Sequence, residues 1–169
     1  MGARKGKLFT TVALAVTAIT AGVAFAAGGR SSGPDYKYAG SEPFANATAV
    51  VQVTPRGNGS ALVMLQVKNV DAVAGRTFGA HVHTSPCGAL ATDAGGHYQH
   101  AGLSTTLPLV DREVWLDVTI DDEGNGVAVA IRPWTVASTS SRSVIIHNDP
   151  TNATTGVAGP RLACIDIDT

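Results

Sequence analysis

The stretch EVWLDVTIDDEGNGVAVAIR, residues 113–132, contains the clearest strand pattern of the 169-residue chain. Val114, Leu116, Val118 and Ile120 alternate with polar or aromatic residues, so they lie on one face of a predicted strand. A glycine-rich turn separates this strand from a second alternating run, which is typical of a β-hairpin. The stretch therefore predicts antiparallel sheet rather than helix.

Short β-branched runs of the same kind recur on both sides of this hairpin. No stretch after residue 27 predicts a helix longer than two turns. Many short strands with glycine-rich turns favour an all-β antiparallel sandwich or flattened barrel. We expect Trp115 and Trp134 to be packing residues in it. The seven predicted strands are 49–54, 60–68, 77–83, 113–120, 126–132, 142–147 and 161–167.

The overall composition excludes several classes of protein. The chain has a formal net charge of −1 and no basic cluster beyond its N-terminus, which argues against a nucleic-acid-binding protein. Its hydrophobic fraction of 44% argues against disorder. Two cysteines are too few for a disulfide-rich scaffold or a four-cysteine zinc site. One folded domain is the expectation at this length.

The N-terminal residues differ from the rest of the chain. Residues 1–26 run from three basic residues through an uncharged stretch to Ala-Phe-Ala, which predicts a secretory signal peptide cleaved after Ala26. A membrane anchor is the alternative, because the uncharged run of about 20 residues just meets the spanning length. Cleavage would remove three positive charges and take the net charge from −1 to −4. Residues 27–44 predict a flexible tether, and 45–169 the folded domain, secreted or held at the cell envelope.

Four of the five histidines lie at predicted strand ends or in the long segment that follows one of them. His81 and His83 are two residues apart on a predicted strand, so both imidazoles point to the same face. His97 lies in the irregular segment 84–112, and His147 ends an apolar run. A pair of surface histidines would explain His81 and His83 taken alone. Four separate imidazoles favour a copper or zinc site.

These histidines belong to the motifs FGAHVH (78–83), GHY (96–98) and VIIH (144–147), followed by GPRLAC (159–164). In order and residue type, the motifs resemble the copper/zinc superoxide dismutase family across roughly residues 45–168. The resemblance implies an eight-stranded antiparallel Greek-key β-barrel. It also implies an enzyme that converts superoxide to oxygen and hydrogen peroxide by cycling one copper ion between two oxidation states. The copper ligands implied are His81, His83, His97 and His147.

The resemblance further implies a disulfide between Cys87 and Cys164, and a role for Arg161 in attracting superoxide to the copper. An acidic domain with an anionic substrate needs such a local positive charge. The alternative function is an exported protein that binds, buffers or delivers copper on the same fold. Dimer surfaces differ between branches of this family, so a homodimer is an open question.

The sequence departs from the family at the zinc site. After His97 it offers at most His100 and one of Asp93 or Asp111, so we do not expect zinc. The loop between the last copper histidine and the arginine is also short. Both features resemble the copper-only branch, in which an acidic residue hydrogen-bonds the histidine that would otherwise bridge two metals. Glu113 is the candidate for that role, and an exposed charge at a strand start is its alternative interpretation.

The strand count departs from the family as well. Two predicted strands precede the histidine pair, where the family has three. Either residues 36–45 form an irregular edge or one strand is missing.

Overall fold

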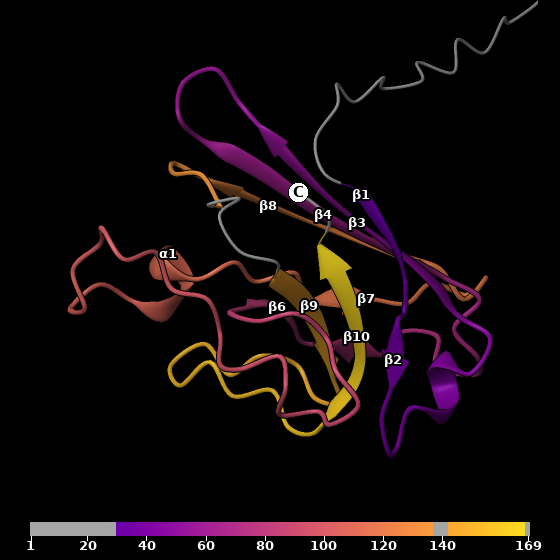
Figure 1. Cartoon of the computed structure of the whole chain (residues 1–169). Helices are drawn as coiled ribbons and strands as arrows, with labels where there is room; N and C mark the ends of the chain where they lie inside the picture. The colour runs from indigo at the N-terminus through magenta and orange to yellow at the C-terminus, as the bar shows by residue number, and fades with distance from the viewer. Residues whose placement is uncertain (1–29, 137–141, 168–169) are drawn as a thin grey trace, which may run out of the picture.

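The computed structural model describes residues 30–136 and 142–167 (Figure 1). The predicted signal peptide, residues 1–26, lies outside these ranges. None of the helices within them has the length and apolar character needed to cross a bilayer. The described residues form β1 Arg30–Gly33, β2 Tyr36–Lys37, η1 Glu42–Phe44, β3 Thr48–Pro55, β4 Ala61–Lys68, β5 Thr77–Phe78, β6 Ala80–His83, α1 Leu109–Arg112, β7 Val118–Thr119, β8 Gly126–Arg132, β9 Arg142–His147 and β10 Arg161–Ile167.

Two four-stranded sheets form the body of the domain. Sheet I has the strand order β1-β3-β4-β8, and sheet II has the order β2-β10-β9-β6. All neighbouring strands are antiparallel. The chain changes sheet repeatedly. Strands β1, β3, β4 and β8 lie in sheet I, while β2, β6, β9 and β10 lie in sheet II, so strands far apart in the sequence become neighbours (Figure 1). This arrangement confirms the predicted all-β antiparallel Greek-key class.

The main core lies between the two sheets. In sheet I, Val63 and Leu65 of β4 are fully buried, while the residues between and beside them are partly exposed. In sheet II, Ala80 and Val82 of β6 and Ile146 of β9 belong to the same core cluster. Because side chains alternate along a strand, the neighbours of these residues lie on the outer face of sheet II. That outer face is where three of the four histidines project.

Residues 30–44 correct the prediction of a flexible tether over 27–44. The β1 strand pairs with β3 at the edge of sheet I, and β2 pairs with β10 at the edge of sheet II. Phe44 follows in η1 and is fully buried in the core. Backbone hydrogen bonds to β3 and β10 hold this segment in place. Because this pairing does not require alternating apolar side chains, the glycine- and serine-rich sequence contains no strand pattern. Residues 36–45, one of the two interpretations of the missing strand, contribute the short edge strand β2, whereas β1 lies before that range.

Two predicted strands are shorter than expected. The strand over 77–83 divides at Gly79 into β5 and β6, and only β7 remains of the strand over 113–120. Trp115 still forms an isolated bridge with His81, so the segment before β7 stays beside sheet II. The predicted alternation is confirmed, because four residues are no more than 1% exposed: Val114, Leu116, Val118 and Ile120.

Candidate metal centre

Four histidines from three segments meet on the outer face of sheet II. His81 and His83 come from β6, and His147 ends β9. His97 lies in the segment after β6, where its backbone bridges to that of His83. The candidate ligand atoms of these four side chains all lie within 4.8 Å of one another. The structure therefore brings together all four histidines that the sequence singled out.

Burial keeps three of these histidines neutral. His81 and His83 are fully buried, and His147 is 4% exposed. Loss of hydration lowers the pKa of His81 to about 2, that of His83 to about 3 and that of His147 to about 4. At neutral pH these imidazoles carry a lone pair on one nitrogen. This is the form in which histidine binds a metal.

The hydrogen bonds of His83 and His147 settle which nitrogen carries that lone pair. In each ring, Nδ1 lies 3.1 Å from a backbone carbonyl oxygen, that of Gly95 for His83 and that of Gly159 for His147. A carbonyl can only accept, so both Nδ1 atoms carry the proton. The Nε2 atom of each ring is buried without a hydrogen-bond partner in the described structure. An unpaired buried acceptor is costly unless something binds it.

His97 is held by a carboxylate. Its Nδ1 lies 3.0 Å from Oε2 of Glu113, which is only 2% exposed. Trp115 Nε1 donates to the same oxygen at 2.7 Å, and Gln99 Nε2 donates to Oε1 at 2.9 Å. Burial acts to raise the pKa of Glu113, but these hydrogen bonds outweigh it and hold the pKa below its usual value. The alternative interpretation of Glu113 as an exposed charge is therefore wrong.

Two contacts of Glu113 were not predicted. Trp115 was expected only to pack, and Gln99 had no expected role. The alternation in 113–120 did contain a signal for Trp115, because it places this side chain on the face opposite the core. Its ring also stands edge-on to that of His81, with centroids 5.9 Å apart. Gln99 is itself held by Arg112 Nη1, which donates to its Oε1 at 2.6 Å.

The residues considered for zinc are not brought together. His100 lies against Trp134, with ring centroids 4.8 Å apart, and its Nδ1 accepts from the backbone of Gly102. The carboxylate of Asp93 accepts from the backbone N–H of Leu90 at 2.9 Å. Within the described ranges, the histidine cluster that could hold a metal contains neither His100 nor an aspartate.

Arg161 and the disulfide tie the segment after β6 to β10. Cys87 and Cys164 form the predicted disulfide across 77 positions of sequence. Arg161 donates from Nη1 to the carbonyl of Ala91 at 2.5 Å and from Nη2 to that of Gly95 at 2.6 Å. The Gly95 oxygen also accepts from His83. One carbonyl thus anchors both the guanidinium and a candidate ligand.

The loop over 148–160 covers the other side of the histidines. Gly79 allows its close approach, because a Cβ there would lie 2.6 Å from Cβ of Ala158. The backbone N–H of Gly79 donates to the carbonyl of Asp149 at 2.9 Å. Further along the loop, Gly156 sits over the His97–Glu113 pair, so a Cβ there would lie 3.7 Å from Nδ1 of His97.

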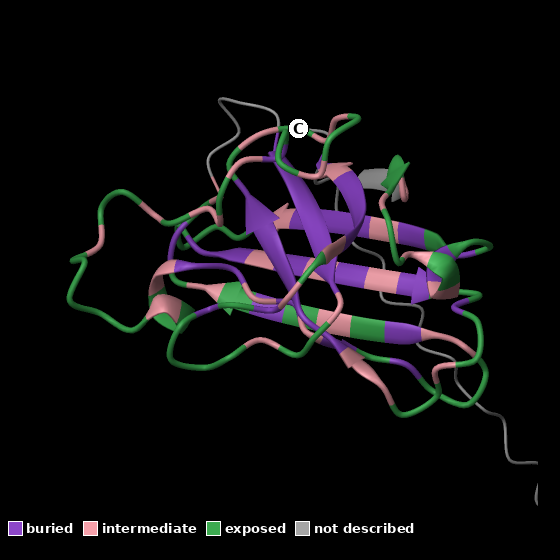
Figure 2. Ribbon diagram, turned by 90° about the horizontal axis from the view of Figure 1, so that it is seen from below, coloured by how far each residue is buried: buried purple, intermediate pink, exposed green. Residues whose placement is uncertain are grey.

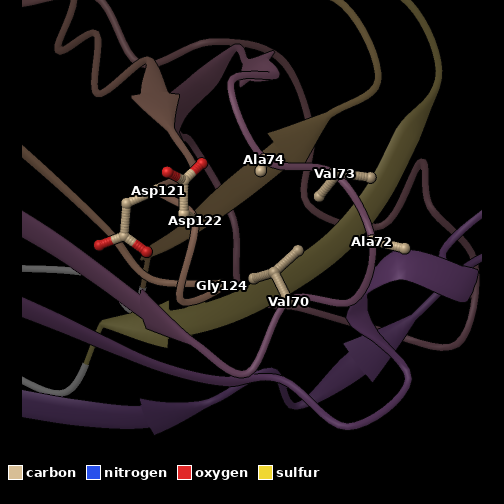
Figure 3. Close-up of a pocket in the computed structure, with 7 residues that line it drawn as sticks. All are labelled: Val70, Ala72, Val73, Ala74, Asp121, Asp122 and Gly124. Carbon is tan, nitrogen blue, oxygen red and sulfur yellow. The ribbon is translucent and has the colours of Figure 1, made fainter.

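A separate surface cavity of about 310 Å³ has different chemistry (Figure 3). Two aspartates lie on one side of it, and Ala72 and Val73 lie on the other. Asp121 Oδ1 accepts from the backbone N–H groups of Glu123 and Asn125, so it closes the hairpin turn before β8. The Asp121 carboxylate therefore stabilises this turn.

Comparisons with known proteins agree with this geometry. The family model described as copper/zinc superoxide dismutase matches residues 47–167. The clock protein EA4 has a similar structure, with a TM-score of 0.56 and 17% identity over 85% of this chain and 98% of that chain. A SOD-like protein from Bacillus subtilis gives a TM-score of 0.54 and 11% identity over 70% of this chain and 89% of that one. At these identities the likeness shows the fold alone. Among curated proteins, none matches the sequence.

Proposed function

The chain belongs to the copper/zinc superoxide dismutase family, and from this premise we propose that it is an exported, copper-dependent superoxide dismutase. The observation that carries the proposal is the convergence of four imidazoles whose candidate ligand atoms all lie within 4.8 Å of one another. Each ring is held through one nitrogen by the protein. The copper ligands we propose are His81, His83, His97 and His147, with one copper ion per chain and no zinc.

The donor atoms fit copper. Three ring nitrogens, His81 Nδ1, His83 Nε2 and His147 Nε2, are buried without a hydrogen-bond partner in the described residues. Imidazole is a suitable ligand for this metal. Bound copper would supply the redox chemistry, taking an electron from one superoxide to give oxygen and passing it to a second, which becomes hydrogen peroxide with two protons.

Glu113 supports the choice of copper without zinc. Its carboxylate occupies the Nδ1 side of His97, the side that a second metal would need for a bridging imidazole. A carboxylate can only accept, so His97 keeps a proton on Nδ1. Glu113 would then orient the His97 ring as an outer-shell partner does in other metal sites.

Arg161 is the residue we assign to substrate attraction. The domain would be acidic after cleavage, at −4, while superoxide is an anion. A fixed guanidinium near the histidines raises the local concentration of an anion. Hydrogen bonds to Ala91 and Gly95 hold Arg161 in place, and the neighbouring disulfide restrains the same segment.

Export is supported by two features. Residues 1–26 have the basic, apolar and small-residue order of a signal peptide. The Cys87–Cys164 bridge also supports export, since disulfides persist in oxidising compartments and are rare in the cytosol.

The test is metal analysis and a superoxide assay on protein purified from the culture medium, whose N-terminal sequence reports cleavage after Ala26. We expect one copper, negligible zinc and dismutase activity. Arg161→Ala should lower turnover by at least about tenfold and weaken its dependence on ionic strength, with copper content unchanged. Arg56→Ala is the matched control, because it removes one exposed positive charge at the β3–β4 turn.

Two results would overturn this proposal. If the copper-loaded wild type has no dismutase activity, the protein is better described as a copper-binding or copper-delivering protein. If Arg161→Ala retains full turnover, superoxide attraction does not depend on this residue.

A further inference from the structure

His81 differs from the other three histidines in which of its ring nitrogens is hydrogen-bonded to the protein. Its Nε2 lies 2.7 Å from the hydroxyl oxygen of Thr151, and its Nδ1 is the buried atom without a partner. In His83, His97 and His147 the protein holds Nδ1 instead. We propose that Thr151 and Asp117 are positioning residues that fix the reversed tautomer of His81 and so present its Nδ1 to the metal.

The direction of these hydrogen bonds follows from the chemistry of the three groups. Asp117 Oδ1 lies 2.5 Å from the Thr151 hydroxyl, and its Oδ2 accepts from the Thr151 backbone N–H at 2.8 Å. A carboxylate can only accept, and a hydroxyl has a single hydrogen. That hydrogen is committed to Asp117. The hydroxyl can then only accept from His81, so the proton of His81 lies on Nε2 and Nδ1 is bare.

The arrangement is built from three segments that the fold holds together. His81 lies on β6, Asp117 follows the bridge at Trp115, and Thr151 lies in the loop over 148–160. Gly79 makes room for the loop, because a Cβ there would lie 2.9 Å from Oγ1 of Thr151. Asp117 accepts hydrogen bonds from both the backbone N–H and the hydroxyl of Thr151. The hydroxyl therefore has a fixed place beside the ring.

Thr151→Val is the direct test, because valine keeps the shape of threonine and removes the hydroxyl. The readout is the tautomer of each histidine in the metal-free protein, from nitrogen-15 NMR of the imidazole rings. In the wild type we expect the proton of His81 on Nε2, and the protons of the other three rings on Nδ1. In Thr151→Val, His81 should become a mixture of tautomers while the other three rings stay unchanged. Thr151→Ser should restore the wild-type pattern.

A Nδ1-protonated His81 in the wild type would overturn the proposal, and so would an unchanged His81 in Thr151→Val. The unchanged pattern of the other three rings distinguishes a local effect from a failure to fold. This readout needs no metal and no activity.

The consequence for metal binding rests on the proposed function and is measured separately. Loss of an outer-shell partner typically costs about 10–100-fold in metal affinity. We expect that loss for copper binding to Thr151→Val and near-wild-type affinity for Thr151→Ser. Equal affinity in all three proteins would overturn the positioning role. Absence of dismutase activity in the copper-loaded wild type would overturn only the enzymatic assignment.

Discussion

The two sheets of the domain differ in the number of faces they bury. In sheet I the outer face is open, and Val127, Val129 and Ile131 of β8 are all more than half exposed. In sheet II every residue of β9 is buried. Figure 2 shows the contrast as continuously purple strands beside strands banded in purple, pink and green.

The second buried face of sheet II has a small core of its own. Ile145 and Cys164 pack there with Ala94, which comes from the segment that follows β6. The same face carries His81, His83 and His147. The loops that cover the sheet are also those that hold the histidine rings. We infer that the outer face of sheet II forms the base of the metal centre. The packing of this face and the positions of the histidine rings then depend on the same loops.

An isoleucine on each outer face tests this difference. Ile145 is fully buried under the loops, and Ile131 is 54% exposed on sheet I. Ile145→Ala should lower the free energy of unfolding by about 2–5 kcal/mol, as burial predicts. Ile131→Ala should change it by about 0.5 kcal/mol or less. Urea unfolding of the metal-free proteins measures both, and equal losses would show that the loops do not form a packed layer.

The sequence predicted the elements whose signal lies in side-chain alternation. The buried face of 113–120 is one example, and the apolar run that ends at His147 is another. The edge strand β1 was missed, and β2 was anticipated only as an irregular edge, because backbone pairing rather than apolar side chains places both strands. Their partners, β3 and β10, lie in different sheets, and no local pattern records that.

The residues of the metal centre also differ in whether the sequence could predict them. The four histidines followed from strand alternation and from the family motifs. Glu113 came from the family resemblance. Thr151 and Asp117 are 34 positions apart and meet only in the folded chain. Neither residue has a local pattern that points to His81, so this contact could not be predicted from the sequence.

The buried histidines of sheet II predict a stability that depends on pH. Their pKa values are lowered by burial, to about 4 for His147. Above about pH 6.5 both folded and unfolded chains hold neutral imidazole. Below it the unfolded chain binds a proton that the folded chain does not, so the free energy of unfolding falls as the pH falls toward 4.

His147→Gln measures the contribution of one histidine. Its removal should make the decline between pH 6.5 and pH 5 shallower by up to about 1.4 kcal/mol per pH unit. Denaturant unfolding of the copper-free protein at several pH values gives the slope. Ile131→Ala, on the open face of sheet I, should keep the wild-type slope. A wild type equally stable at pH 5 and pH 7 would contradict the prediction.

The smallest effect concerns the loop over the His97–Glu113 pair. Gly156 has a φ of +71° and Gly75 a φ of +77°, so alanine at either position is strained by about 1 kcal/mol. A Cβ at Gly75 meets nothing within 4 Å, whereas one at Gly156 would lie 3.2 Å from Cδ1 of Leu109. Both alanine variants should lose similar stability on urea unfolding, with a few tenths of a kcal/mol more lost for Gly156→Ala.

The distinguishing readout is local. Only Gly156→Ala should displace the cover over His97 and speed exchange of its Nδ1 proton with water, as proton NMR of the imidazole N–H signals would report. Gly75→Ala has the same backbone strain without that contact, so it separates the two causes. If both variants leave the exchange rate of the His97 proton unchanged, the loop does not shield the His97–Glu113 bond.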